Sequence, residues 1–387
     1  MRKGGLRSCG QLHSIQPGWD ARRKTWKRIS AAVLLGRRRQ SEQIANVYQM
    51  YVSGMTSPGR PIATFLFLGP TGSGKTRVVE ATAEHLLNNP GAVIKIDCAE
   101  FQHSHEIAKL IGSPPGYIGH RETKPALSQE ALDRHQTDTL KISIVLFDEI
   151  EKASDALWNL LLGILDKATL TLGDNSKVAF SHAMIFMTSN FGATETNAIL
   201  KPRLGFAPSG REDQDLRETR DDLQNKISCA GLEAVRRRFT PEFVNRLDTI
   251  VVFKPLGRTE LRQVLEIELQ GVQERIFQNL SDPFIFSVTD AGKEFLLREG
   301  TNLNYGARHL KRAIDRLVVH PMSNLIASGQ ILSGDAIRVD HPYSSPSMAF
   351  SLEEEGLPVP ERAKLANDYL TQTPSVSAVV AGESHSA

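Results

Sequence analysis

Eight consecutive residues constrain the fold of this chain more strongly than any other feature. They stand between an apolar run, Thr64–Leu68, and a stretch with helical periodicity, Thr76–Leu87. They are Gly69, Pro70, Thr71, Gly72, Ser73, Gly74, Lys75 and Thr76, which fit the pattern G-x-x-x-x-G-K-[ST]. Glycines let the backbone N–H groups of such a loop turn toward phosphate oxygens, and the following helix points its positive end at them. The order strand, loop, helix therefore predicts a phosphate-binding site on an α/β sheet.

Two side chains of this loop have specific roles in the predicted site. Lys75 is placed to reach the terminal phosphates, and the Thr76 hydroxyl is placed to ligate Mg²⁺. The rest of the loop is expected to surround the phosphates with backbone groups. We therefore expect ATP and Mg²⁺ as cofactors.

Two further apolar runs end in polar residues that suit the same chemistry. Ile144–Phe147 is followed by Asp148, which is expected to hold Mg²⁺, and by Glu149, which is expected to polarise the attacking water. Standing alone, such a run is more often a strand that enters solvent, but here it follows a phosphate-binding loop in the same predicted sheet. Asn190 follows the run Ala183–Thr188 and could hydrogen-bond the attacking water, although Asn is also a common turn residue.

Composition excludes several classes of protein. The 387 residues are 40% hydrophobic and 23% charged, which is typical of a globular chain and not of a collagen-like, coiled-coil or wholly disordered one. Its apolar runs are shorter than the roughly 18 residues of a membrane-spanning helix. Three widely spaced cysteines cannot form a disulfide framework or a zinc site alone, so we expect a reducing, cytoplasmic location and no membrane partner. A net charge of +2 makes nucleic acid an unlikely partner.

Pattern and charge divide the chain into four parts. Residues 1–28 are basic and lack periodicity, so we expect a disordered tail, with a nucleic-acid or membrane-surface arm or a transit peptide as alternatives. Residues 29–255 alternate helix-like and strand-like stretches, as in a parallel sheet with flanking helices. Residues 256–340 predict a small α+β domain, built from a helix at Thr259–Leu280, strands at Phe284–Val288 and Ala336–Val339, and a helix at Leu310–Val319. Residues 341–387 are Ser/Pro-rich and then small and polar, so they are expected to be a disordered tail.

Several segments, in this order and spacing, resemble an AAA+ ATPase. More narrowly, they are similar to the second, C-terminal ATPase module of the Clp unfoldase and disaggregase family, over residues 29–340. The segments are 65–72, 114–119, 147–153, 239–248 and 305–308. The resemblance implies a P-loop AAA+ parallel sheet with flanking helices, followed by a small α+β lid domain.

The resemblance also implies roles for residues outside the loop. Arg246 matches the arginine finger, which acts on the γ-phosphate of a neighbouring subunit, and Arg308 matches sensor 2, the lid arginine that contacts the phosphates. Asn190 matches sensor 1. Leu34 and Leu35 stand where the family places the residues that flank adenine, although Arg37 replaces the usual Gln.

The resemblance gives the predicted function its direction. Tyr117 and Ile118, between Gly116 and Gly119, match the first pore loop, which grips a threaded polypeptide, and residues 172–175 stand where a second pore loop is expected. The implied assembly is a homo-oligomeric ring, expected to be a hexamer, which acts on unfolded or tagged protein clients. Leu204, Gly205 and Phe206 resemble the tripeptide that docks into a Clp-type peptidase.

Four functions stay open at this point. The favoured one is an ATP-driven protein unfoldase or remodelling chaperone that threads polypeptide through a ring pore. A nucleic-acid-remodelling AAA+ ATPase is favoured by the basic first segment and opposed by Tyr117. A transcriptional-activator ATPase would need the loop Gly-Ala-Phe-Thr-Gly-Ala, which the sequence lacks. A nucleotide-switched scaffold is opposed by the presence of both Glu149 and Arg246.

Overall fold

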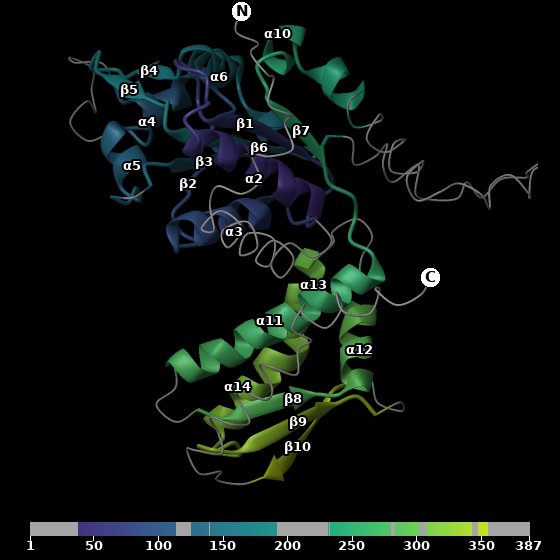
Figure 1. Cartoon of the computed structure of the whole chain (residues 1–387). Coiled ribbons are helices and arrows are strands. Elements are labelled where there is room, and N and C mark those ends of the chain that lie inside the picture. The colour runs from purple at the N-terminus through teal and green to yellow at the C-terminus, as the bar shows by residue number, and fades with distance from the viewer. Residues whose placement is uncertain are drawn as a thin grey trace, which may run out of the picture.

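The computed structural model describes most of the two predicted domains. The described residues are 38–113, 125–138, 140–191, 231, 233–279, 283–301, 307–342 and 347–354. Figure 1 shows a larger part built around a sheet and a smaller part, which begins with helix α11 (Arg258–Asn279). The predicted tail at 1–28 and residues 355–387 lie outside the described residues.

The larger part is organised by a five-stranded sheet in which every neighbouring pair is parallel. The strand order is β2 (Ile94–Asp97), β3 (Ser143–Asp148), β6 (Ala183–Ser189), β1 (Ala63–Leu68) and β7 (Thr249–Val252). The parallel α/β fold with flanking helices is therefore confirmed. Because all strands run the same way, their carboxyl ends meet at one edge, where open α/β sheets bind ligands.

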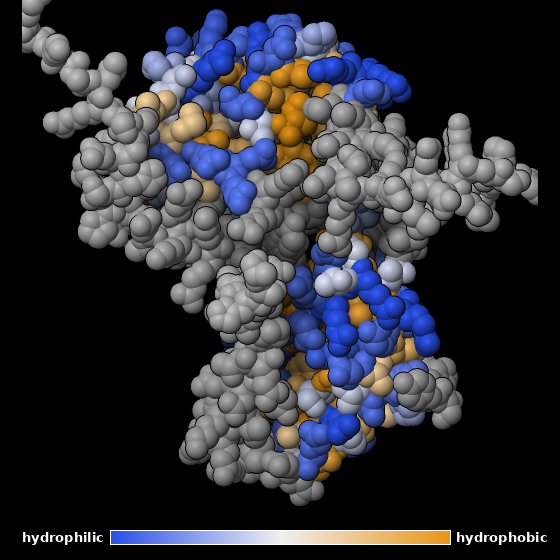
Figure 2. Space-filling view, turned by 45° about the vertical axis from the view of Figure 1, so that its right-hand side comes forward, coloured by the Kyte–Doolittle hydropathy of each residue, from blue (hydrophilic) through white to orange (hydrophobic). Residues whose placement is uncertain are grey.

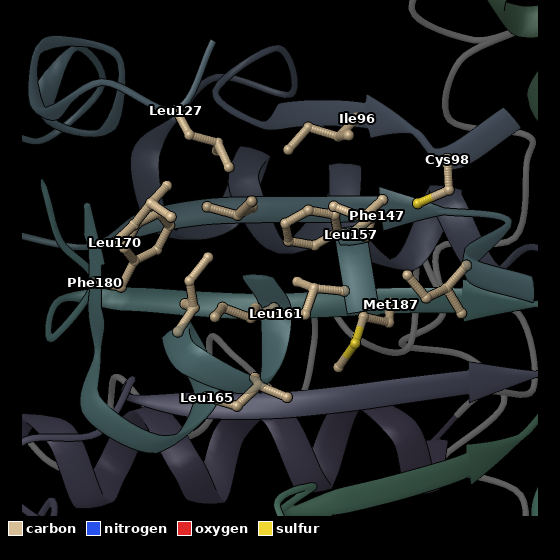
Figure 3. Close-up of a cluster of buried hydrophobic side chains, with 14 of the residues drawn as sticks. Ile96, Cys98, Leu127, Phe147, Leu157, Leu161, Leu165, Leu170, Phe180 and Met187 are labelled. Atoms are coloured by element: carbon tan, nitrogen blue, oxygen red, sulfur yellow. The ribbon is translucent and has the colours of Figure 1, made fainter. Parts of the chain in front are cut away.

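The side chains of each central strand alternate between two cores. In β1, Leu66 and Leu68 belong to the cluster on one face, while Phe65 and Phe67 belong to the cluster on the other. Helix α6 (Asp155–Lys167) covers the first face, and helices α2 (Arg38–Val52) and α3 (Lys75–Leu87) cover the second. Figure 3 shows the first cluster, in which α6 packs along the sheet from Leu157 to Leu165.

Short elements complete the larger part. They are η2 (Cys98–Glu100), η3 (Ser104–Ile107), α4 (Ala108–Ile111), α5 (Gln129–Asp133), η4 (Ile150–Lys152), β4 (Thr169–Thr171), β5 (Lys177–Ala179) and α10 (Pro241–Val244). Strands β4 and β5 form an antiparallel hairpin whose turn is the predicted second pore loop, residues 172–175.

The smaller part has the predicted α+β composition. Its elements after α11 are β8 (Ile285–Val288), α12 (Asp290–Gly300), α13 (Ala307–Ile314), the π-helical turn η5 (Asp315–Val319), α14 (His320–Ala327) and β9 (Ala336–Asp340). Thr289 caps α12, because its hydroxyl accepts a hydrogen bond from the Gly292 N–H. Much of the face of this part seen in Figure 2 is hydrophilic. Among the described residues, no helix is both long and apolar enough to cross a membrane.

One strand lies where the sequence analysis expected a disordered tail. Strand β10 (Ala349–Glu354) pairs antiparallel with β9 and forms the edge of a three-stranded sheet in the order β10, β9, β8. Met348 is buried in the core of the small part, and the His341 ring stacks on Phe295 with 3.8 Å between centroids. The expectation of a disordered tail from residue 341 is therefore wrong for residues 349–354. The Ser/Pro-rich composition before them indicated disorder, although a short strand follows.

We expect Met348 to contribute measurably to the stability of the small part. Met348→Ala removes a buried side chain that packs near Gly292, so it should lower the free energy of unfolding by about 2 kcal/mol. Leu352→Ala is the matched control, because Leu352 lies on β10 and is 44% exposed. Chemical denaturation followed by circular dichroism measures both. If Met348→Ala lowers the free energy of unfolding as little as the exposed-site control Leu352→Ala, residues after 340 do not belong to the folded domain.

Candidate functional site

The loop between β1 and α3 has the backbone geometry that a phosphate cradle needs. Gly69, Gly72 and Gly74 have φ angles of 141°, 75° and 91°, in the region that favours glycine. A Cβ on Gly69 would lie 2.4 Å from the Phe253 carbonyl oxygen, so no larger residue fits there. Gly74 begins α3 without a side-chain cap, which leaves the first-turn N–H groups available to an anion.

Lys75 is a buried cation at the carboxyl edge of the sheet. Its Nζ donates to the carbonyl oxygens of Gly69 at 2.6 Å and Pro70 at 3.1 Å, and to Asn190 Oδ1 at 2.9 Å. Burial lowers the pKa of Lys75 to about 8, and the nearby carboxylates of Glu151, Asp148 and Glu149 oppose this shift. All three hydrogen-bond partners are neutral oxygens, so a phosphate would give the ammonium a charged partner.

Asp148 and Glu149 lie at the end of β3 and are held by the same residue of β6. The Thr188 hydroxyl donates to Asp148 Oδ1 and accepts from the Glu149 N–H at 3.0 Å. Each acid also faces a lysine: Lys95 Nζ lies 3.4 Å from Asp148 Oδ2, and Lys152 Nζ lies 2.5 Å from Glu149 Oε2. Thr188 was treated in the sequence analysis only as the end of a strand, although a polar residue inside an apolar run is a signal of such a role.

Glu149 has a left-handed backbone, with φ 56° and ψ 49°. A residue with a Cβ pays roughly 1–2 kcal/mol for this conformation, and such conformations cluster at functional sites. Because of this turn, the side chains of Asp148, at the end of β3, and of Glu149, just after it, point in different directions. They contact different lysines, Lys95 and Lys152.

Asn190 lies in the site, one residue after β6. Its Oδ1 accepts from Lys75 Nζ and lies 3.3 Å from Thr71 Oγ1, while its backbone N–H donates to Glu151 Oε1 at 3.0 Å. The structure thus brings the predicted sensor residue into contact with the phosphate loop. The sequence analysis missed Glu151, because its contact with Asn190 joins two loops that are distant in the sequence.

The small domain contacts the phosphate loop directly. The Ala307 N–H donates to the Gly72 carbonyl oxygen at 3.3 Å, at the start of α13. Arg308 is the next residue, it is exposed, and its charge acts on Lys75 by lowering the pKa of that side chain. Arg308 therefore lies near the predicted phosphate site, on the side of the lid.

Arg246 is not brought together with the other predicted residues. It follows α10 and precedes β7, and its carbonyl oxygen accepts from Thr64 Oγ1 at 3.1 Å, at the amino end of β1. The five residue-to-residue steps of extended chain from Thr64 to Gly69 span roughly 16 Å. In this chain the Arg246 guanidinium pairs with Asp166 and Glu242. Arg246 therefore lies at the opposite edge of the sheet from its own phosphate loop.

Several predicted residues lie outside the described residues. They are Leu34, Leu35, Tyr117, Ile118, Leu204, Gly205 and Phe206. The predicted second pore loop is described and forms the tight turn of the β4–β5 hairpin. Its Gly173 N–H donates to the Ile111 carbonyl oxygen at 2.8 Å, and a Cβ on Gly173 would lie 2.6 Å from the Gly112 carbonyl oxygen. This turn thus packs against Ile111 and Gly112, which precede the segment that contains Tyr117.

The arrangement fits ATP and Mg²⁺. The positive-φ glycines and the uncapped start of α3 suit phosphate oxygens, and Lys75 supplies a buried positive charge. Thr76, in the first turn of α3, and Asp148 are the residues that would hold Mg²⁺ together with phosphate oxygens and water.

Comparison with known proteins identifies the family. Residues 60–250 match the family model of the AAA domain (Cdc48 subfamily), and residues 256–339 match the C-terminal, D2-small domain of ClpB. This chain belongs to the AAA family, in its Clp branch. The candidate nucleotide site, called the AAA site below, has its phosphate loop within the matched AAA domain, and the small part matches the D2-small domain of ClpB.

Individual relatives agree with this assignment. The chain is 34% identical over 308 residues to the ATP-dependent Clp protease ATP-binding subunit ClpC of Staphylococcus saprophyticus, covering 80% of this chain and 35% of ClpC. It is 38% identical over 288 residues to the chaperone ClpB of Rhizobium meliloti, covering 74% of this chain and 30% of ClpB. A cryo-EM structure of closed-state Hsp104 with ATPγS and FITC-casein superposes with a TM-score of 0.68 at 27% identity, over 88% of this chain and 53% of that one. The chain thus spans about a third of the length of these curated relatives.

The pKa of Lys75 leads to a prediction for the AAA site. Because burial lowers this pKa to about 8, part of the Lys75 population is neutral above pH 8 in the free chain, and a phosphate would restore its charge. Binding of ATP should therefore take up a proton above pH 8, and the affinity should fall by up to tenfold for each further pH unit. Well below pH 8 the lysine is charged in both states, so its contribution to the affinity should not vary with pH.

Isothermal titration in two buffers of different ionisation enthalpy measures this proton uptake. Lys75→Arg is the control, because a guanidinium stays charged and its binding of ATP should show no proton uptake between pH 8 and 10. Binding to the unaltered chain at pH 9 without proton uptake would contradict the assignment of Lys75 as the phosphate ligand.

Proposed function

We propose that this chain is an ATP-driven protein unfoldase or remodelling chaperone. The observation that carries the proposal is a network at one edge of the sheet: hydrogen bonds join Lys75, Asn190 and Glu151, and the charges of Asp148 and Glu149, which Thr188 holds, act on Lys75. The names of the similar proteins, a chaperone and an ATP-binding subunit of an ATP-dependent protease, support the direction of the proposal.

Each residue of the network has a task in the proposed reaction. Lys75 and the loop N–H groups bind and orient phosphate oxygens, and Thr76 and Asp148 hold Mg²⁺. Glu149 accepts a hydrogen bond from the attacking water and makes it more nucleophilic, while Asn190 and Arg308 fix the position of the phosphates. Bound ATP supplies the phosphoanhydride whose hydrolysis provides the free energy for work on a client.

We further propose that the chain works as a ring of identical subunits, expected to be a hexamer. Arg246 lies at the edge of the sheet opposite to its own phosphate loop, so it can act as an arginine finger only on a neighbouring copy. Three exposed apolar side chains, Met50, Val52 and Met55, lie at or just after the end of α2 and before β1, and Met55 is 76% exposed. A contact with another copy would cover them.

Client handling is assigned to residues outside the described ranges. Tyr117 and Ile118 are proposed to line the pore and grip a threaded polypeptide, and Leu204, Gly205 and Phe206 are proposed to dock a Clp-type peptidase. A cytoplasmic location belongs to the same proposal. The alternative of nucleic-acid remodelling rests on the basic residues within 1–28.

The proposed unfolding activity depends on Tyr117 more than on any other residue outside the AAA site. Tyr117→Ala removes a large ring whose contact with a client would contribute about 1–3 kcal/mol in each subunit. ATP hydrolysis should stay within a few-fold of the parent rate, while unfolding of a stable tagged fluorescent protein should fall at least tenfold. Tyr117→Phe is the matched control and should retain most of the unfolding activity, because the proposed grip is apolar.

Glu149→Gln is the reference variant for the loss of ATP hydrolysis. It should bind ATP but hydrolyse it at least a hundredfold more slowly, the scale of losing a general base. Two results would sink the proposed function: Tyr117→Ala that unfolds clients at the parent rate, or a parent chain that hydrolyses ATP only when DNA or RNA is added.

A further inference from the structure

Arg246 is fixed both at its backbone and at the end of its side chain. Its carbonyl oxygen accepts from Thr64 Oγ1, and Thr64 in turn pairs with Asp248, whose Oδ2 accepts from the Thr64 N–H at 2.7 Å. At the other end, Arg246 Nε and Nη2 lie 2.5 Å and 2.7 Å from the two carboxylate oxygens of Asp166. This bidentate pair is the strongest geometry for an arginine and a carboxylate, and it fixes the plane of the guanidinium. The Arg246 side chain is only 19% exposed.

Asp166 occupies an unfavourable place in its own helix. It lies in the last turn of α6, where the backbone carbonyl groups give the helix a negative end. An acid there is disfavoured by the helix, and Arg246 supplies the compensating positive charge. The pKa of Asp166 is lowered by the hydrogen bond from Arg246, and the charges of Arg60 and Lys167 act in the same direction. The acid is thus ionised, and its place in α6 is explained by Arg246 and not by the local requirements of the helix.

The two edges of the guanidinium are held unequally. Asp166 holds the Nε–Nη2 edge from the end of a helix that is buried along one face. The opposite side is held by Glu242, which lies four residues earlier and contacts Nη1 through its 64% exposed carboxylate at 2.8 Å and its backbone carbonyl oxygen at 3.4 Å. The Glu242 carboxylate can turn away at little cost, which leaves only the longer backbone contact on Nη1, while Asp166 keeps the guanidinium plane in place. The edge so freed carries N–H groups of Nη1 and Nη2, the donors that suit phosphate oxygens.

Helix α6 also fixes where Asp166 lies relative to the AAA site. The helix begins shortly after Glu149, through η4, and its 13 residues extend about 18 Å along the sheet. Figure 3 shows Leu157, near its start, beside Phe147 and Met187, and Leu165 toward the opposite end of the strands. Asp166 is thus carried to the far edge of the sheet by a helix packed into the core.

We propose that Asp166 is the positioning residue of Arg246: it holds the guanidinium by one edge and presents the other edge to the phosphates bound by a neighbouring copy of this chain. This inference rests on the proposed function, since it assigns a second residue to the same shared site. Asp166 does not touch the nucleotide and acts only through Arg246.

The test compares Asp166→Ala with Asp155→Asn in the full chain. Asp155 is an exposed acid in the first turn of the same helix and serves as the matched control. Asp166→Ala should lower kcat for ATP hydrolysis about tenfold and leave KM within twofold, because ATP binds at the other edge of the sheet. Asp166→Asn should fall between Asp166→Ala and the parent, since an amide oxygen keeps one of the two hydrogen bonds. Asp155→Asn should match the parent.

A mixing experiment separates positioning from a loss of folding. Asp166→Ala keeps its phosphate loop and Lys75→Ala keeps its arginine, so mixing the two variants should restore part of the activity that each lacks alone. Failure of the mixture to regain activity, an unchanged kcat in Asp166→Ala, or a raised kcat would overturn the proposal. A raised kcat would mean that Asp166 masks Arg246 and does not present it.

A readout that needs no hydrolysis distinguishes this proposal from the proposed function. Solvent exchange of the Arg246 Nε–H, followed by ¹⁵N NMR, should be slow in the parent and in Asp155→Asn and at least tenfold faster in Asp166→Ala. Equal exchange in all three chains would refute the role of Asp166. A parent chain with slow exchange but without ATP hydrolysis would instead refute the proposed function.

Discussion

The buried ammonium of Lys75 is the interaction on which the rest of the site depends. It lies where the carboxyl ends of β1 and β6 meet, and its hydrogen bonds to Gly69, Pro70 and Asn190 join the phosphate loop to the loop after β6. Desolvation makes this placement costly, as the lowered pKa indicates, and among the described residues the hydrogen bonds of the ammonium go to neutral oxygens. The fold therefore places the Lys75 ammonium where an anion from solvent would bind it.

The parallel sheet places two kinds of group at its two edges. The carboxyl edge brings together Lys75 at the start of α3, Asp148 at the end of β3 and Asn190 just after β6, and the small domain adds Arg308. The amino edge carries Arg246, which is pinned to Thr64 and Asp166. A chain with its phosphate ligand on one edge and its arginine on the other is suited to act with copies of itself, since neither edge alone forms a complete site.

The sequence predicted those parts of the candidate site that lie within short contiguous segments. The loop from Gly69 to Thr76, the pair Asp148 and Glu149, and Asn190 each follow an apolar run, so a short pattern sufficed to find them. The sequence analysis did not predict Thr188, Glu151 and Asp166, because their roles depend on contacts between residues that are distant in the sequence. Strand β10 escaped because a short edge strand after a Ser/Pro-rich segment has a weak periodic signal, and its stability comes from tertiary contacts such as that of Met348.

The most direct test of a site shared between copies is a cryo-EM structure of Glu149→Gln assembled with ATP and Mg²⁺. The account predicts that the Arg246 guanidinium lies within hydrogen-bonding distance of the γ-phosphate bound by the neighbouring subunit, with Asp166 still on its Nε–Nη2 edge. ATP bound in the phosphate loop, with Arg246 far from the nucleotide at every subunit contact, would contradict it.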